Sequence, residues 1–208
     1  MLGQGDPLQP EKSRRTGALE VWISGQVEYL QCGKLVERNR IDDPVVETLI
    51  ANESRPRVLA HDDGLLAVLR GINRNADADP EDMVSIRIWL TGDSIITVRQ
   101  RKVRAAAEVH ESLLAGRGPA STADAMVMII DRLAAGAGEF IERLEDRVGE
   151  FEESINERNT SEARSGTAET RRAIASIRRY LAPQRAALET LCRQGSAWFD
   201  KDQLYTLR

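Results

Sequence analysis

Residues 54 to 104 consist of short apolar runs separated by tight-turn signals, and this arrangement constrains the fold more than any other feature. Leu65 to Leu69 is an unbroken apolar run of strand length, which is typical of a strand covered on both faces. Met83 to Leu90 alternates, with apolar side chains at every second position and Ser85 and Arg87 facing the other way. We therefore expect a sheet built from strands of this segment.

Turn residues divide the segment into its strands. Asp62-Asp63-Gly64 follows a predicted strand over Pro56 to Ala60 and indicates a hairpin in which Gly64 takes a positive φ. Thr91-Gly92-Asp93 turns the chain into a strand over Ile95 to Arg99. The other predicted elements are a strand over Leu19 to Ile23, a short helix that begins at Asp42-Asp43-Pro44 with Asp43 as its cap, the polar loop Asn73 to Asp82, and a helix over Lys102 to Leu114.

From residue 119 onward the sequence has the character of long helices. Ser121 and Asp124 have the spacing of a capping box, and a heptad-like apolar seam follows. Thr160 to Gly166 is polar and small, which predicts a turn before a second helix. Pro183 should kink or restart that helix, and a third helix is predicted from about Trp198. The seam residues are Ile141, Leu144, Val148, Phe151 and Ile155 in the first helix, and Ile174, Ile177, Leu181, Leu188 and Leu191 in the second.

The two long predicted helices differ in charge. Glu139 to Glu157 holds eight acidic and two basic residues, whereas Glu169 to Arg193 holds six arginines and two glutamates. Antiparallel packing would place opposite charges side by side and help to fix the pairing, which is the simpler interpretation. The alternative is that the acidic helix raises the local cation concentration near an ion path. The sequence leaves both interpretations open.

Composition narrows the classes of function. The net charge of -4 argues against a nucleic-acid binder, which normally carries a basic excess. Cys32 and Cys192 form no metal-ligand spacing and no disulfide framework, which favours a reducing compartment. The longest apolar run, Ala125 to Ile130, is far shorter than the roughly 20 residues that a membrane-spanning helix needs.

Metal-binding and catalytic candidates are few. His61, Asp62 and Asp63 place three possible zinc ligands on one turn, although a solvated hairpin turn is the simpler interpretation. His110, on a predicted helix, is a weaker candidate. The loop that begins at Asp77 lacks the glycine and the glutamate that a calcium-binding EF-hand requires. The sequence contains no phosphate-binding glycine loop and no nucleophile motif, so we predict no enzymatic activity and no required cofactor.

A set of segments, taken in order, resembles the ZntB-type zinc transporters of the CorA metal-transporter superfamily. Each segment is a weak signal alone, and the ordered set is the specific one. The later run from Arg171 to Arg185 resembles the wider superfamily, so that the resemblance covers roughly residues 18 to 208. The earlier segments are Ser54-Arg55-Pro56-Arg57, Asp62-Asp63-Gly64-Leu65-Leu66, Leu69-Arg70-Gly71-Ile72-Asn73, Glu81-Asp82-Met83-Val84-Ser85-Ile86-Arg87-Ile88-Trp89 and Ile96-Thr97-Val98-Arg99.

The resemblance implies an α+β fold in αβα layers. Its parts would be a mixed β-sheet flanked by helices, a long helical hairpin and the start of a stalk helix. The expected units are a mobile tail over residues 1–17, an α/β sheet subdomain over 18–118, the helical hairpin packed on it over 119–195, and the start of a truncated stalk helix over 196–208.

The resemblance also implies a function. Members of the family form homopentameric funnels on the cytoplasmic side of the bacterial inner membrane and move divalent cations, zinc in the ZntB type. This chain lacks the Gly-Met-Asn signature of the family's pore, so we expect it to be the soluble portion of a longer protein. Zinc or another divalent cation and further copies of the chain are the expected partners, with membrane contact only through a segment outside this chain. The alternative is a soluble helical-hairpin adaptor without a metal function.

Overall fold

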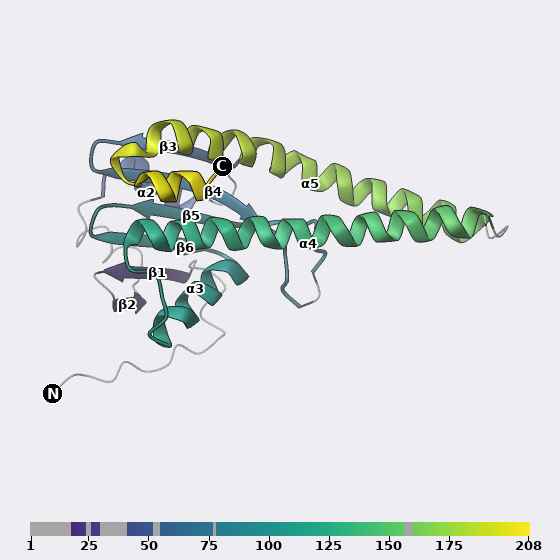
Figure 1. The fold of residues 1–208 in the computed structure, drawn as a ribbon, viewed down its shortest axis with the longest axis horizontal. Coiled ribbons are helices and arrows are strands. Elements are labelled where there is room, and N and C mark those ends of the chain that lie inside the picture. The colour runs from purple at the N-terminus through teal and green to yellow at the C-terminus, as the bar shows by residue number, and fades with distance from the viewer. Residues whose placement is uncertain (1–17, 24–25, 30–40, 52–54, 77, 157–159) are drawn as a thin grey trace.

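The computed structural model describes residues 18–23, 26–29, 41–51, 55–76, 78–156 and 160–208. The tail predicted over residues 1–17, and Cys32, lie outside these ranges. Within them a six-stranded sheet carries helices on both faces, and a helical hairpin runs past one end of it (Figure 1). The strand order is β2-β1-β6-β5-β4-β3, and the strands are β1 (Ala18–Ile23), β2 (Gln26–Tyr29), β3 (Arg57–His61), β4 (Gly64–Gly71), β5 (Val84–Leu90) and β6 (Ser94–Arg99).

Every neighbouring pair of strands in this sheet is antiparallel. The predicted α+β class and its layers of helices are confirmed, but the prediction of a mixed sheet is wrong. Short connections explain two of these pairs: His61 pairs with Gly64 and Leu90 with Ile95, so β3 and β4, and likewise β5 and β6, double back at tight turns. A parallel pair would have required a crossover of a dozen or more residues.

The central strands are buried on both faces. All five residues of Leu65 to Leu69 in β4 are buried, as the unbroken apolar run predicted. The alternation in β5 predicted one polar face, yet Arg87 is only 1% exposed and Trp89 4%. A second helical layer therefore covers the face of β5 that carries Ser85 and Arg87, as the predicted αβα layers require.

The smaller layer is α2 (Asp43–Ile50), which packs Val45 and Leu49 against Trp89. Asp42, not Asp43, occupies the N-cap position, and its side chain makes no capping hydrogen bond. The larger layer consists of α3 (Arg104–Leu114), α4 (Thr122–Asn156), α5 (Thr160–Gln194), the 3-10 turn η2 (Gly195–Ala197) and α6 (Lys201–Thr206).

The start of α4 forms the predicted cap. The amide of Asp124 donates to Oγ of Ser121 at 3.0 Å, and the carboxylate of Asp124 accepts from Nε2 of Gln203 in α6 at 2.7 Å. α6 begins at Lys201 rather than at about Trp198, because Asp200 and Gln203 form a capping box there. Leu207 then packs into the main core beside Leu191 of α5. The last residues of the chain thus fold back onto the hairpin.

The hairpin agrees with its sequence prediction only in part. Thr160 to Gly166, predicted as a turn, belongs to α5. α5 continues through Pro183 without restarting, and a kink there stays a prediction. Of the predicted seam, Leu144, Ile177 and Leu191 are buried, whereas Ile141, Val148 and Ile174 are exposed by 40%, 37% and 40%. Phe140 and Ala173, which lie outside the predicted seam, join Leu144 and Ile177 in the hairpin core.

Opposite charges meet between α4 and α5, as expected, but the basic partner comes from the acidic helix. Among the described side chains, Arg147 of the acidic helix pairs with Glu169 of the basic helix at 3.6 Å. Glu139 of α4 instead pairs with Arg74 of the loop that follows β4. Both pairs are largely exposed, and such pairs contribute little to stability. Apolar packing at Phe140 and Ile177 therefore holds the hairpin together more than charge does.

Candidate functional site

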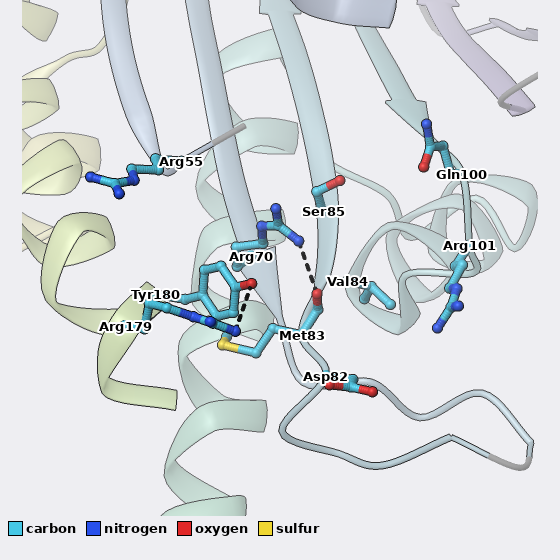
Figure 2. A pocket seen from close by; sticks show the side chains of 10 residues that line it. All are labelled: Arg55, Arg70, Asp82, Met83, Val84, Ser85, Gln100, Arg101, Arg179 and Tyr180. Atoms are coloured by element: carbon cyan, nitrogen blue, oxygen red, sulfur yellow. Dashed lines mark hydrogen bonds between the residues drawn. The ribbon is translucent and has the colours of Figure 1, made fainter. Parts of the chain in front are cut away.

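An arginine-rich pocket lies at one end of the sheet. In an antiparallel meander the starts of β3 and β5 and the ends of β4 and β6 meet at the same end. This geometry brings together Arg55 before β3, Arg70 near the end of β4, Ser85 at the start of β5 and Arg101 after β6 around a cavity of about 720 Å³. We call this cavity the arginine pocket (Figure 2).

Helix α5 supplies another wall of the arginine pocket. The ring of Tyr180 has the guanidinium of Arg70 4.7 Å from its centre and that of Arg179 4.9 Å from it. Arg179 also donates to the Tyr180 hydroxyl at 3.2 Å (Figure 2). Cation–π contacts of this kind hold guanidinium groups in place without neutralising them. Tyr180 therefore fixes two positive charges at the pocket.

The backbone of β4 is tied to the same helix. The pairing of β3 with β4 ends at Arg57 and Val68, so Arg70 lies beyond the reach of β3. The amide of Arg70 donates to Oε1 of Gln184 at 2.6 Å, and the Gln184 side chain is buried. A side chain of α5 thus takes the place of a strand partner and sets the distance between Arg70 and Tyr180.

A buried arginine, Arg87, lies behind the pocket. Arg87 donates to Oγ of Ser85 at 3.0 Å and to the carbonyl oxygen of Ala51 at the end of α2. Burial, and then the positive charge of Arg70, lower the pKa of Arg87 from its ordinary value. Among the described residues that line the pocket, Asp82 is the acidic one, facing four arginines. The described lining therefore has an excess of positive charge.

The predicted metal candidates lie at the opposite end of the sheet. His61 at the end of β3 and the next two residues, Asp62 and Asp63, line a cavity of about 250 Å³ together with Asp42. The His61 ring packs edge-on against Trp89, with ring centres 5.6 Å apart. This contact lies on the α2 face of the sheet. The structure thus brings three of the four predicted residues to one cavity.

His110 does not join them. It lies on α3, whose buried residues pack on the other face of the sheet. Within the described part of the chain, no group of three or more histidine, cysteine, aspartate or glutamate side chains has the arrangement to hold a metal ion. Cys192 is a free thiol whose pKa is raised, first by burial. The Cys192 thiol donates a weak hydrogen bond to the carbonyl oxygen of Leu207, so we assign Cys192 a role in packing.

Sequence reasoning did not find the arginine pocket. Arg55, Arg70 and Ser85 fall in segments that carry the family resemblance, and Tyr180 falls in the later one. Each segment was informative in sequence, but their meeting at one cavity depends on the meander and on the docking of α5. The available signal was the presence of arginine in five of those six segments.

Across the described residues, none of the helices combines the length and the apolar character needed to cross a bilayer. Comparison with protein families matches residues 26–208 to the family described as CorA-like Mg2+ transporter protein. A zinc transport protein ZntB from Yersinia enterocolitica is 37% identical over 159 residues, which is 76% of this chain and 48% of that protein. The ZntB of Pectobacterium atrosepticum is 34% identical over 97% of this chain and 59% of its own length.

Solved structures agree with the fold. The ZntB cytoplasmic domain from Vibrio parahaemolyticus matches with a TM-score of 0.78 and 26% identity, over 92% of this chain and 87% of that one. The full-length CmaX protein matches with a TM-score of 0.80 at 24% identity, over 99% of this chain and 70% of its own, which supports the fold alone. The chain thus spans about half the length of the curated relatives and most of a cytoplasmic domain. This chain belongs to the CorA-like Mg2+ transporter family.

Proposed function

We propose that the chain is the cytoplasmic domain of a membrane transporter for divalent cations and that zinc is its substrate. The observation that carries this proposal is the match to the ZntB cytoplasmic domain over 92% of the chain, with 26% identity. Relatives that are 34% and 37% identical are zinc transport proteins. The length of those relatives that this chain does not cover would supply the membrane part and the pore.

In this proposal the domain has a structural role at the cytoplasmic side of the bacterial inner membrane. Five copies would surround a central path, and the sheet and hairpin would form the wall of a funnel. The domain would carry out no enzymatic reaction, since the named relatives are transport proteins. The acidic face of α4, much of which is exposed, would attract cations to that path.

Zinc flux tests the proposal directly. The complete protein that contains this chain is reconstituted in liposomes that hold a zinc-sensitive dye. We expect external zinc to raise the dye signal above that of liposomes without the protein. Magnesium is the comparison ion, because the description of the family names Mg2+. Flux of neither ion would refute the proposal and favour the adaptor alternative, in which the exposed side chains of Ile141, Val148 and Ile174 contact another protein.

Assembly is a separate part of the proposal. Native mass spectrometry of the complete protein in detergent should show a species of five copies. A species of one copy at every protein concentration would remove the pentamer from the proposal, whatever the flux experiment shows. The same measurement on the 208-residue chain tests whether the cytoplasmic domain associates by itself.

Zinc contact at His61, Asp62, Asp63 and His110 stays a prediction. Calorimetric titration of the chain with zinc, compared between the unchanged chain and the variants His61→Ala and His110→Ala, tests it. Loss of heat in His61→Ala alone would support the turn at the α2 face. Absence of heat in the unchanged chain would remove a metal-sensing role and leave the funnel role in place.

A further inference from the structure

The arginine pocket is a concave, polar site of a size that suits a small molecule. Its volume of about 720 Å³ lies within the range of roughly 300–1,000 Å³ that is common for small-molecule sites. A single inorganic ion would leave most of this space empty. Arg55, Arg101 and Arg179 are exposed at the pocket, so their guanidinium groups are accessible from solvent.

The charge of the pocket selects the chemistry of its ligand. Guanidinium groups present planar pairs of donors that match the oxygens of phosphate. The described lining carries four arginines and one carboxylate, Asp82. Burial, and then the positive charge of Arg70, lower the pKa of Arg87 behind the pocket, so Arg70 and Arg87 are like charges close enough to interact. An anion placed between them would relieve that repulsion.

We propose that the arginine pocket binds a soluble compound with two or more phosphate groups. Arg70 and Arg179, held against Tyr180, form the fixed part of the site. Arg55, which precedes β3, and Arg101, which follows β6, lie in loops and form the adaptable part of the site. The Tyr180 ring is already in contact with the guanidinium groups of Arg70 and Arg179. The pocket should therefore recognise the phosphate groups of its ligand rather than a base stacked on Tyr180.

Two other classes of anion fit the pocket less well. Nucleic acid normally meets an extended basic surface, whereas this chain has a net charge of -4 and concentrates arginines in one cavity. An anionic membrane also favours an exposed basic or amphipathic surface over a concave site. The proposal is independent of cation transport, because it concerns a site that the transport proposal does not use.

The test is isothermal titration calorimetry of the 208-residue chain with pyrophosphate and with ATP, both without added divalent cation. We expect saturable binding of one equivalent that weakens as salt concentration rises. The double variant Arg101→Gln/Arg179→Gln removes two exposed charges at the pocket and should weaken binding by roughly tenfold or more. Arg178→Gln is the matched control, since Arg178 is exposed, adjacent in α5 and not part of the lining.

Further variants separate the role of Tyr180 from that of overall charge. Tyr180→Phe keeps the ring under both guanidinium groups and should bind nearly as tightly as the unchanged chain, whereas Tyr180→Leu should bind several-fold more weakly. Circular dichroism establishes that each variant is folded. An equal loss of binding in Arg178→Gln would overturn the site, because it would show a diffuse charge effect.

Three more outcomes would overturn the proposal. One is the absence of measurable binding of pyrophosphate and ATP at millimolar concentration. Another is co-flotation of the chain with phosphatidylglycerol vesicles, lost in Arg101→Gln/Arg179→Gln, without binding of either soluble compound. The third is competition by citrate as effective as that by pyrophosphate, which would show that the pocket selects charge rather than phosphate.

Discussion

Gly64, at the start of β4, is required by close packing. A Cβ atom built on it would lie 2.6 Å from the carbonyl oxygen of Leu90 and 2.7 Å from the Trp89 ring. The sequence predicted a glycine at this turn for its positive φ, and that reason is wrong, since φ of Gly64 lies outside the left-handed region. Gly116, after α3, is the described glycine with φ of 68°. The neighbouring strand, which sequence does not reveal, imposes the requirement on Gly64.

Substitution of Gly64 tests this explanation. Gly64→Ala should lower the free energy of unfolding by about 1–3 kcal/mol, because the added methyl group overpacks the backbone of β5. Gly92→Ala is the control, since a Cβ there meets nothing within 4 Å, and it should change stability by less than about 0.5 kcal/mol. Urea denaturation measures both values. Equal effects of the two substitutions would contradict the close-packing explanation.

Asp124 links the start of α4 to α6. The Gln203 hydrogen bond, more than any other cause, lowers the pKa of Asp124 from its ordinary value of 3.8. A carboxyl group with a lowered pKa in the folded state contributes stability above its unfolded pKa and loses it as pH falls through its folded pKa. The link between the two helices should therefore be present at neutral pH and weaken in acid.

Gln203→Ala should reduce the free energy of unfolding by about 1–2 kcal/mol at pH 7, because it removes the hydrogen bond to Asp124 and also the capping-box bond that Gln203 accepts from the Asp200 amide. The reduction should shrink at a pH below the folded pKa of Asp124, where its protonated carboxyl group gains less from Gln203. Thr206→Ala, an exposed change in the same helix, should show no such dependence on pH. Urea denaturation at several pH values between about 2.5 and 7 gives the comparison, because this range covers the titration of an aspartate. A reduction that stays constant over this range would contradict the role of Asp124.

At the scale of elements, the packing of α4 against α5 determines how a glycine in either helix affects stability. Gly166 in α5 faces Phe151 of α4, and a Cβ atom there would lie 2.1 Å from the Phe151 ring. Gly138, in the interior of α4, has nothing within 4 Å of the same position. Gly166 thus lets α5 approach α4 closely, at the end of the segment Thr160 to Gly166 where a turn was predicted.

These two glycines should respond in opposite directions. Gly138→Ala should stabilise the chain by about 0.5–1 kcal/mol, because alanine loses less backbone entropy in a helix. Gly166→Ala gains the same propensity but must displace the Phe151 ring, so its net effect should be destabilising. Thermal denaturation followed by circular dichroism gives both signs. Stabilisation by Gly166→Ala would show that the ring of Phe151 moves aside without cost.

At the scale of the whole molecule, packing density falls along the hairpin. Residues of α4 from Ala123 to Leu144 contribute buried side chains to the two cores that α4 shares with the sheet and with α5. Beyond Leu144, none of the described side chains of α4 is buried. Figure 1 shows this portion of α4 and α5 extending past the sheet. The end of the hairpin thus depends on helix-to-helix contacts alone.

Hydrogen exchange should follow this gradient. Backbone amides of residues 145–156 should exchange faster than those of residues 126–140 in the same helix, because fewer buried contacts oppose local opening. Exchange followed by mass spectrometry of peptic peptides resolves the two segments. Equal protection along α4 would mean that the hairpin and the sheet open only as one unit.

The arginine pocket belongs to this same scale. Its walls come from four strand ends and one helix, and the lining residues lie up to about three fifths of the chain apart, from Arg55 to Tyr180. Arg70 and Gln184 lie 114 positions apart, yet they share a hydrogen bond. No local pattern reports such a contact, because it depends on where α5 docks on the sheet edge.

The sequence by itself determined the local features of this protein. The apolar run Leu65 to Leu69 predicted a doubly covered strand, Ser121 predicted the start of α4, and ordered segments identified the family. These features depend on neighbours in the chain, whose side-chain pattern is visible directly. Tertiary structure decided the rest: the burial of Arg87, the exposure of Ile141 and the gathering of arginines at one end of the sheet. Such features depend on which surfaces of the folded chain meet. The free energy gained by burying them is shared among residues that lie far apart in the sequence, so a short stretch of sequence does not reveal it.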